Sequence, residues 1–195
     1  KLRLTATGDN REELLKLTGE QVCKLYETIP QFIYGEDEET LEMAVGRLLR
    51  DKNLTLCTAE SCTGGKISHK ITSVPGSSDY YRGSVIAYAN DIKTSVLGVD
   101  PILIEREGAV SESVAAAMAE GARNLMKTDF AVATTGIAGP AGGTQLKPVG
   151  TIWIAVSRGS GTITEKHAFT TDRVTNITRF TYAALNLLRK QIIST

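Results

Sequence analysis

The sequence predicts an α/β fold: a three-layer α/β/α sandwich with a partly parallel (mixed) sheet, plus a small N-terminal α/β appendage. Helical and strand-like segments alternate along residues 38–136, which is typical of βαβ units and parallel strands. The segment 130–134 is short, apolar and without alternation, as in a strand covered on both faces. Two strand-like segments joined through residues 158–161 then indicate a hairpin, so antiparallel strands should complete the sheet.

The first 37 residues are the expected appendage. Asp9 or Asn10 can cap a helix that Pro30 ends. The acidic run at 35–39 is the expected boundary between a small segment at 1–37 and a larger domain at 38–195, although the same charges also suit the first turn of a helix. The elements expected in the appendage are a strand at 1–8, a helix at 9–27 and a strand at 32–34.

The larger domain begins with a helix whose apolar residues share one face. Further along, Asn90 and Ser111 are expected N-caps, and Pro101 suits a first helical position. The expected helices are at 38–51, 66–71, 90–98, from 101, at 111–126 and at 172–192. The expected strands are at 54–59, 81–89, 130–134, 149–156 and 162–169.

Composition excludes several classes of function. With 22 basic and 22 acidic residues, no net field attracts nucleic acid or an anionic membrane, and 6% aromatic residues are too few for a base-stacking surface. No apolar run approaches the ~20 residues of a membrane span. Three cysteines and two histidines match neither a disulfide framework nor a zinc pattern, which favours a reducing, cytoplasmic compartment and no metal. Because the chain starts at Lys1 rather than Met, we expect a longer parent protein.

Three loops are candidates for chemistry, because ligands of open α/β sheets bind beyond the carboxyl ends of the strands. The loops at 60–65, 88–93 and 135–143 are rich in Gly, Ser, Thr or Asn, which allow close approach of the backbone to a ligand. Neither the G-x-x-x-x-G-K-[ST] phosphate loop nor G-x-G-x-x-G occurs, which excludes a mononucleotide kinase and a dinucleotide fingerprint.

Ser61 follows a strand and precedes a helix, where unpaired backbone N–H groups favour negative charge. Its hydroxyl either caps that helix or acts as a nucleophile beside ready oxyanion donors. A nucleophilic serine needs a base, and neither His69 nor His167 is well placed to be one. A lysine of lowered pKa is the remaining candidate. Lys93 lies at a loop-to-helix transition and is either that base or a surface lysine.

Two further side chains leave alternatives open. Cys62 lies beside the positive end of a helix, which lowers a thiol pKa, so it is either a nucleophile or a small buried residue. Arg173 lies in the first turn of the last helix, where the helix dipole opposes a cation. Either an anionic ligand or the neighbouring Asp172 carboxylate compensates this charge.

Four stretches taken together carry a resemblance. They are T-A-E-S-C-T-G-G at 58–65; P-G-S-S at 75–78 with Y-R-G-S-V-I-A-Y-A-N at 81–90 and Lys93; G-A-V-S at 108–111; and T-T-G-I-A-G-P at 134–140 with K-P-V-G-T at 147–151. In order and spacing they resemble the C-terminal domain of the CinA (competence/damage-inducible) proteins, the nicotinamide-mononucleotide amidohydrolases, over about residues 40–190. Residues 1–36 resemble the small α/β linker segment of full-length CinA proteins.

The resemblance implies hydrolysis of the carboxamide of nicotinamide mononucleotide (NMN), a small-molecule nucleotide, to nicotinic acid mononucleotide and ammonia without metal or cofactor. It implies Ser61 as nucleophile, Lys93 as base and Tyr88 as relay or proton donor, with N–H groups near 62–65 stabilising the oxyanion. It also implies a homo-oligomer and, in the full-length chain, an N-terminal molybdopterin-binding-like domain. The residues expected to bind substrate are Thr63, Gly64, Gly65, Asn90, Thr135, Gly136, Gly139 and Arg173.

Two other functions stay open. A catalytically silent nucleotide-binding module that regulates the missing N-terminal domain would bind a ligand without turnover. A hydrolase with Cys62 as nucleophile would turn substrate over without Ser61. The presence of Ser61, Lys93 and Tyr88 together favours the serine amidohydrolase.

Overall fold

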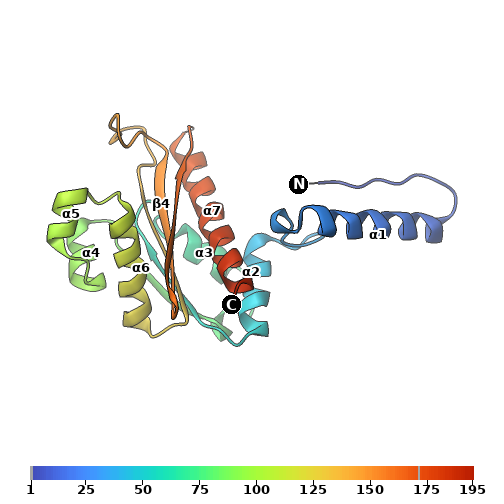
Figure 1. Ribbon diagram of the computed structural model, residues 1–195, viewed down its shortest axis with the longest axis horizontal. Helices are drawn as coiled ribbons and strands as arrows, with labels where there is room; N and C mark the ends of the chain where they lie inside the picture. The colour runs from blue at the N-terminus through green and yellow to red at the C-terminus, as the bar shows by residue number, and fades with distance from the viewer. Residues whose placement is uncertain (1, 171) are drawn as a thin grey trace. The chain divides into compact units, whose positions relative to one another are not determined.

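The computed structural model describes residues 2–170 and 172–195, and the chain divides into two compact units, Lys1–Glu39 and Thr40–Thr195. The first unit contains helix α1 (Arg11–Thr28) and a 3₁₀ turn, η1 (Pro30–Phe32) (Figure 1). Asn10 caps α1, since its Oδ1 accepts from Glu12 N at 3.1 Å. Asn10 rather than Asp9 is therefore the cap.

The two strands expected in the first unit are wrong. Residues 2–8 have no regular structure, Lys1 lying outside the described residues, and Phe32 belongs to η1. A strand needs a hydrogen-bonded partner and a face to bury. No side chain of α1 is buried, so the unit offers no such face. Pro30, at the first helical position, favours the turn of η1 instead.

The second unit is built on a five-stranded mixed sheet in the order β2-β1-β3-β4-β5, which confirms the predicted α/β class. Strand β1 pairs in parallel with both β2 and β3, whereas β3–β4 and β4–β5 are antiparallel. Strand β2 ends three residues earlier than expected and β3 ends two residues later. The strands are β1 (Leu56–Glu60), β2 (Tyr81–Ile86), β3 (Phe130–Gly136), β4 (Thr151–Arg158) and β5 (Gly161–Ala168).

Helices cover both faces of this sheet, as predicted for three layers. Figure 1 shows α6 with α4 and α5 on one side, and α7 with α2 and α3 on the other. Ser111 caps α6 as expected, but Ala89 holds the N-cap position of α4, so the expected Asn90 cap is wrong. The helices are α2 (Leu41–Asp51), α3 (Lys66–Thr72), α4 (Asn90–Leu97), α5 (Pro101–Glu107), α6 (Glu112–Met126) and α7 (Arg173–Ile193), with a 3₁₀ turn η2 (Ser77–Asp79).

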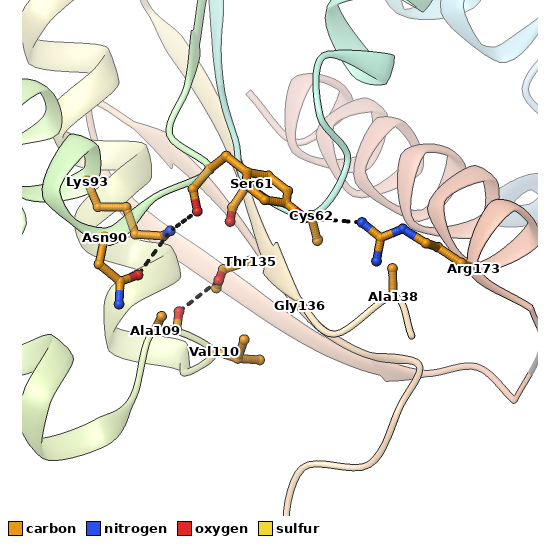
Figure 2. A pocket seen from close by; sticks show the side chains of 11 residues that line it. Ser61, Cys62, Asn90, Lys93, Ala109, Val110, Thr135, Gly136, Ala138 and Arg173 are labelled. Carbon is orange, nitrogen blue, oxygen red and sulfur yellow. Dashed lines mark hydrogen bonds between the residues drawn. The ribbon is translucent and has the colours of Figure 1, made fainter. Parts of the chain in front are cut away.

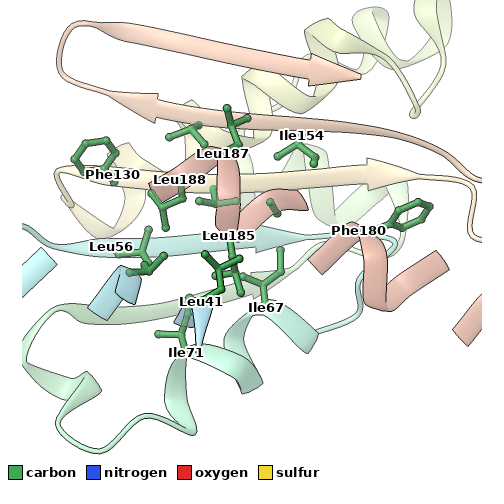
Figure 3. Close-up of a cluster of buried hydrophobic side chains, with 14 of the residues drawn as sticks. Leu41, Leu56, Ile67, Ile71, Phe130, Ile154, Phe180, Leu185, Leu187 and Leu188 are labelled. Atoms are coloured by element: carbon green, nitrogen blue, oxygen red, sulfur yellow. The ribbon is translucent and has the colours of Figure 1, made fainter. Parts of the chain in front are cut away.

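The two faces of the sheet have different cores. Large aliphatic and aromatic side chains, including Leu56, Phe130 and Leu185, fill the side of α2, α3 and α7 (Figure 3). The α6 side is rich in alanine, with Met118 and Leu97 as its larger buried side chains. Small residues allow close packing there, since a Cβ at Gly121 would lie 1.9 Å from Leu97 O. Helix α4, which carries Lys93, therefore packs closely against α6.

The mixed topology brings several chain segments to one edge of the sheet. The parallel strands β2, β1 and β3 all end at this edge. Because β3–β4 and β4–β5 are antiparallel, β4 starts and β5 ends at the same edge, where Gly136 pairs with Ile152 and Thr151 with Ala168. The start of α7 follows directly. The turn between β4 and β5 lies at the opposite edge.

Candidate active site

A cavity of about 190 Å³ opens at the carboxyl ends of the three parallel strands (Figure 2). Its walls come from the turn after β1, the segment from β2 into α4, the segment between α5 and α6, the end of β3 and the start of α7. The lining residues are Ser61, Cys62, Tyr88, Asn90, Lys93, Ala109, Val110, Thr135, Gly136, Ala138 and Arg173.

Ser61 is the first residue after β1 and is 8% exposed. Its N–H donates to Thr134 O at 3.0 Å, which extends the β1–β3 ladder by one residue. The N-cap of α3 is Gly65, at φ +94°, and no side chain at that position caps the helix. The cap alternative for Ser61 is therefore wrong, and its hydroxyl lines the cavity instead.

The start of α3 is occupied by Glu60, a residue that sequence reasoning missed. Its side chain is 0% exposed, and its carboxylate accepts from the backbone N–H of Gly65 (3.0 Å), Ile67 (3.1 Å) and Ser68 (2.8 Å). These N–H groups favour negative charge as expected, but the carboxylate of Glu60 supplies that charge rather than a ligand. A glutamate directly before a turn and a helix start was the available signal.

Lys93 lies on α4 and is 1% exposed. Its Nζ donates to Tyr88 O at 3.1 Å and to Asn90 Oδ1 at 3.4 Å, and no ion pair links it to a carboxylate within residues 2–170 and 172–195. Burial lowers the pKa of this amine below its usual 10.5, against smaller opposing effects of Cys62 and Asp91. The surface-lysine alternative is therefore wrong.

Ser61 and Lys93 thus line one cavity although they are 32 positions apart in the sequence. Figure 2 shows the amine end of Lys93 extending toward the part of the cavity that Ser61 lines. In the described structure no hydrogen bond joins the Ser61 hydroxyl to the Lys93 amine. Hydrogen bonds between a nucleophile and its base are often long in structures without substrate and tighten when substrate binds.

Arg173 is held by two neutral acceptors. Nη1 donates to Gly139 O at 2.7 Å and Nη2 donates to the phenol oxygen of Tyr88 at 3.1 Å. Asp172 caps α7 instead, accepting from Val174 N and Thr175 N at 3.0 Å each, and forms no ion pair with Arg173 among the described contacts. The alternative that the Asp172 carboxylate compensates the charge of Arg173 is therefore wrong.

Cys62 lines the cavity but is 6% exposed. Burial raises the pKa of its thiol to about 12, although the α3 N-terminus follows closely. At neutral pH the thiol is therefore protonated, and a protonated thiol is a poor nucleophile. This environment fits the small-buried-residue alternative.

The other expected binding residues divide into two groups. Asn90, Thr135 and Gly136 line the cavity, whereas Thr63, Gly64, Gly65 and Gly139 do not. Thr63 is buried with its hydroxyl on Thr134 Oγ1 at 2.8 Å, and the N–H groups of Gly64 and Gly65 already have partners in Ser61 O and Glu60. Of the expected oxyanion donors, only Cys62 N–H and Thr63 N–H donate to no other residue in the described part of the chain.

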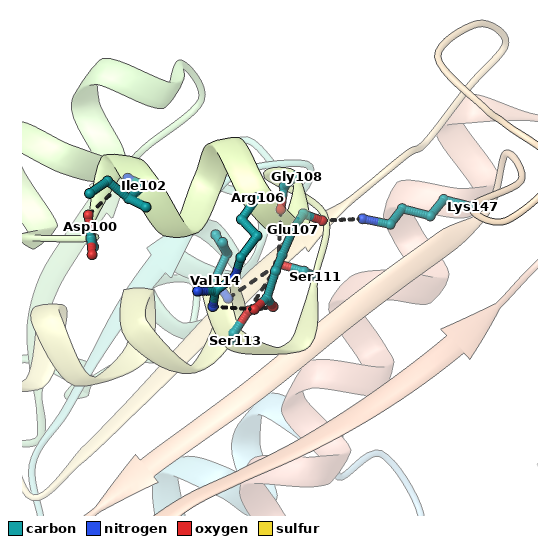
Figure 4. A network of polar contacts seen from close by, with 9 residues as sticks. All are labelled: Asp100, Ile102, Arg106, Glu107, Gly108, Ser111, Ser113, Val114 and Lys147. Atoms are coloured by element: carbon teal, nitrogen blue, oxygen red, sulfur yellow. Dashed lines mark hydrogen bonds and ion pairs between the residues drawn. The ribbon is translucent and has the colours of Figure 1, made fainter.

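The wall opposite β1 was also missed as part of the site. Ala109 and Val110 contribute to it, and Thr135 Oγ1 donates to Ala109 O at 2.7 Å. Figure 4 shows how this segment is anchored: Lys147 Nζ, from the loop between β3 and β4, donates to Glu107 O at 2.5 Å. The Glu107 carboxylate in turn accepts from Ser113 on α6. One lysine therefore ties two walls of the cavity together.

Within the described residues, no three or more His, Cys, Asp or Glu side chains form a group that could hold a metal ion. The helices of the described chain include none with the length and hydropathy needed to cross a bilayer.

These features define an α/β domain with a serine–lysine pocket at the parallel edge of a mixed sheet. Residues 38–192 match the model of one family, the CinA C-terminal domain. A CinA-like protein of Cytophaga hutchinsonii is 47% identical over 192 residues, which are 98% of this chain and 46% of the relative. One of Salinibacter ruber is 50% identical over 160 residues, 82% of this chain and 39% of the relative.

Solved structures agree with this match. A CinA superfamily protein of Klebsiella pneumoniae superposes with a TM-score of 0.77 at 30% identity, covering 80% of this chain and 97% of that protein. A competence/damage inducible protein of Agrobacterium tumefaciens gives 0.75 at 35% identity, covering 80% and 96%. The chain belongs to the CinA C-terminal domain family. It spans less than half the length of the two curated relatives.

Proposed function

We propose that this domain hydrolyses the carboxamide of NMN to nicotinic acid mononucleotide and ammonia, with Ser61 as nucleophile and Lys93 as base. One observation carries the proposal: a buried lysine that pairs with no carboxylate of residues 2–170 or 172–195 lines the same cavity as a serine hydroxyl that caps no helix. Burial lowers the pKa of such an amine and so favours its neutral form, which is the form that a base for a serine requires.

The hydrogen bonds of Lys93 suit the neutral amine. A neutral amine has two N–H groups and one lone pair, and Nζ has two acceptors, Tyr88 O and Asn90 Oδ1. Both N–H groups are then used, which leaves the lone pair to accept the proton of the Ser61 hydroxyl. Asn90 and the backbone of Tyr88 orient the base in this proposal.

The reaction then has two halves. Ser61 Oγ bonds to the carboxamide carbon as Lys93 takes its proton, and the carbonyl electrons move to the oxygen, where Cys62 N–H and Thr63 N–H are the available donors. The C–N bond breaks, and protonated Lys93 gives its proton to the leaving nitrogen, which departs as ammonia. Water, deprotonated by Lys93, attacks the ester, and Ser61 regains its proton as the acid leaves.

The mouth of the cavity suits the phosphate. Arg173 is exposed there and has no carboxylate partner among the described residues, and a guanidinium matches phosphate oxygens well. We therefore assign the phosphate of NMN to Arg173. Nicotinamide riboside, which lacks the phosphate, should show a higher KM than NMN, and Arg173→Gln should remove most of that difference.

The central test incubates the chain with NMN and measures ammonia and nicotinic acid mononucleotide together. Equal amounts of both are expected, and Ser61→Ala should lower kcat by about 10³-fold or more, as for other serine nucleophiles. Calorimetric binding of NMN to Ser61→Ala checks that the pocket is intact. Binding by the wild type without ammonia release would instead favour the silent nucleotide-binding module.

A further inference from the structure

We propose that Glu60 is a positioning residue: by occupying the start of α3 with its own carboxylate, it holds the turn at 61–65 in the shape that Ser61 needs. The inference rests on the proposed function, since it assigns a task to Ser61. Glu60 is the last residue of β1 and Ser61 is the next residue. Any movement of the Glu60 backbone is therefore passed directly to the nucleophile.

The contacts of Glu60 explain how its carboxylate can be fully buried without a cation beside it. Oε2 accepts from Gly65 N and Ile67 N, and Oε1 accepts from Ser68 N. No lysine or arginine of the described chain forms an ion pair with it. Three hydrogen bonds to a charged acceptor and the positive end of the helix take the place of a cation.

The same carboxylate closes the turn into a loop with both ends fixed. At one end Ser61 N donates to Thr134 O, and at the other Gly65 N donates to the Glu60 carboxylate. Between them Gly64 N donates to Ser61 O, and the Thr63 hydroxyl bonds to Thr134 Oγ1. Only the N–H groups of Cys62 and Thr63 are left for an oxyanion within this described segment.

A hydroxyl cluster holds α3 in the position that Glu60 requires. Ser68 presents its N–H to Glu60 and its hydroxyl to Tyr81 OH. The Tyr81 hydroxyl also bonds to Thr58 Oγ1 at 2.7 Å, and Thr58 bonds to Ser84 at 2.9 Å. Strands β1 and β2 thus fix the helix from one side while Glu60 fixes it end-on. A substrate anion has no free N–H group at Gly65, Ile67 or Ser68 to bind.

The test is Glu60→Gln, with Glu42→Gln as the matched control. Glu42 is also a buried glutamate, but it lies on α2, pairs with Lys70 at 2.9 Å and does not line the cavity. Glu60→Gln keeps the shape of the side chain but removes its charge and one acceptor. We expect kcat for NMN to fall by about 10²-fold, the size typical of a nucleophile displaced by about 1 Å, with KM nearly unchanged.

Hydrogen exchange supplies a readout independent of turnover. The amides of Gly65, Ile67 and Ser68 should exchange faster in Glu60→Gln and remain protected in Glu42→Gln. A Glu60→Gln protein with fast exchange at these amides but wild-type kcat would overturn the proposal, as would protection that does not change. A purely structural role would lower thermal stability in both variants without altering kcat of the folded protein.

Failure of the proposed function can be told apart from failure of this inference. If the wild type releases no ammonia from NMN, the rate at which a fluorophosphonate probe labels Ser61 takes the place of kcat. Glu60→Gln should slow that labelling and Glu42→Gln should not. If circular dichroism shows that Glu60→Gln does not fold, Glu60→Asp takes its place. This variant keeps the charge on a shorter side chain, and its rate should be lower than that of the wild type by less than about 10²-fold. Equal rates in Glu60→Asp and wild type, with the amides deprotected, would contradict the proposal.

Discussion

Arg173 Nη2 donates to the phenol oxygen of Tyr88 at 3.1 Å, across the mouth of the cavity. The carbonyl oxygen of the same Tyr88 accepts from Lys93 Nζ at 3.1 Å. Tyr88 therefore contacts Lys93 through its backbone carbonyl and Arg173 through its phenol. Tyr88 is 61% exposed, which places it at the rim of the cavity rather than in its interior.

Tyr88→Phe separates these two contacts. The variant keeps the carbonyl that orients Lys93 and loses only the hydroxyl that Arg173 contacts. We expect kcat to fall by less than about tenfold, or ~1.4 kcal/mol of barrier. A proton relay through the phenol would instead cost about 10²- to 10⁴-fold. Steady-state kinetics with NMN decide between the two, and the larger loss would support the expected role of Tyr88 as relay or proton donor.

The pH dependence of kcat/KM should report Lys93. A base must be neutral, and burial lowers the pKa of this amine below 10.5, so activity should rise with pH through an apparent pKa below that value. Activity is then lost as pH falls through this apparent pKa. Lys93→Met should remove the rise of kcat/KM with pH and lower kcat by about 10²-fold or more. If kcat/KM of that variant still rose with pH in the same way, the titrating group would be another residue.

Lys93→Met should also leave the protein at least as stable as the wild type at neutral pH. Because the folded-state pKa is lowered, the protonated amine opposes folding below that pKa, and the cost disappears as pH rises toward 10.5. The difference in stability between the variant and the wild type should therefore shrink as pH rises over that window, because the other titrating groups are the same in both proteins. Melting temperatures measured at neutral pH and at about pH 10 test this. A marked loss of stability at neutral pH would show that the amine is held charged and well paired.

Cys62→Ala should keep most of the activity. The thiol has a pKa of about 12 and is protonated at neutral pH, so it contributes no nucleophile. The loss of a buried group the size of a methylene should cost about 1 kcal/mol of stability. Ammonia release from Ser61→Ala and Cys62→Ala, measured side by side, distinguishes the two nucleophiles. Activity that survives in Ser61→Ala and disappears in Cys62→Ala would establish the thiol hydrolase.

Lys147→Met should weaken substrate binding rather than chemistry. The lysine joins the loop between β3 and β4 to Glu107 O, and the two joined segments contribute Ala138 and Val110 to the cavity. Loss of one such hydrogen bond costs about 1 kcal/mol, or roughly fivefold in KM. Lys190→Met is the control, since Lys190 lies in the last turn of α7 and contacts Glu165. An effect confined to kcat would place Lys147 nearer the reacting atoms than this contact implies.

The periodicity of the sequence was sufficient to predict the second unit. The apolar residues of its segments follow helical or strand spacing, because each helix packs an apolar face against the sheet and each core strand is covered by helices. The strands at 1–8 and 32–34 were wrong because local pattern cannot tell whether a partner strand exists. The ends of β2 and β3 differed by two or three residues, since burial extends β3 through Thr135 while β2 leaves the ladder after Ile86.

The candidate site was predictable in part. Parallel strands end at one edge, so the loops carrying Ser61, Lys93 and Thr135 were expected to meet there, and all three line the cavity. Glu60 was missed because it was counted with the loop at 60–65 rather than as the last residue of β1, and the sequence does not show that backbone N–H groups of the next helix keep it buried. The wall at Ala109 and Val110 carries no polar signal, so only the fold assigns it to the site.

The antiparallel pairing of β4 with β3 also places the β4–β5 turn at the end of the sheet away from the cavity. The β4–β5 turn, Arg158–Gly161, lies beside the amino end of β3, where Arg158 pairs with Phe130, a full strand length from the cavity. Lengthening this connection leaves every cavity wall untouched. A fluorophore or affinity handle inserted between Gly159 and Ser160 would therefore report on the folded domain without disturbing its chemistry.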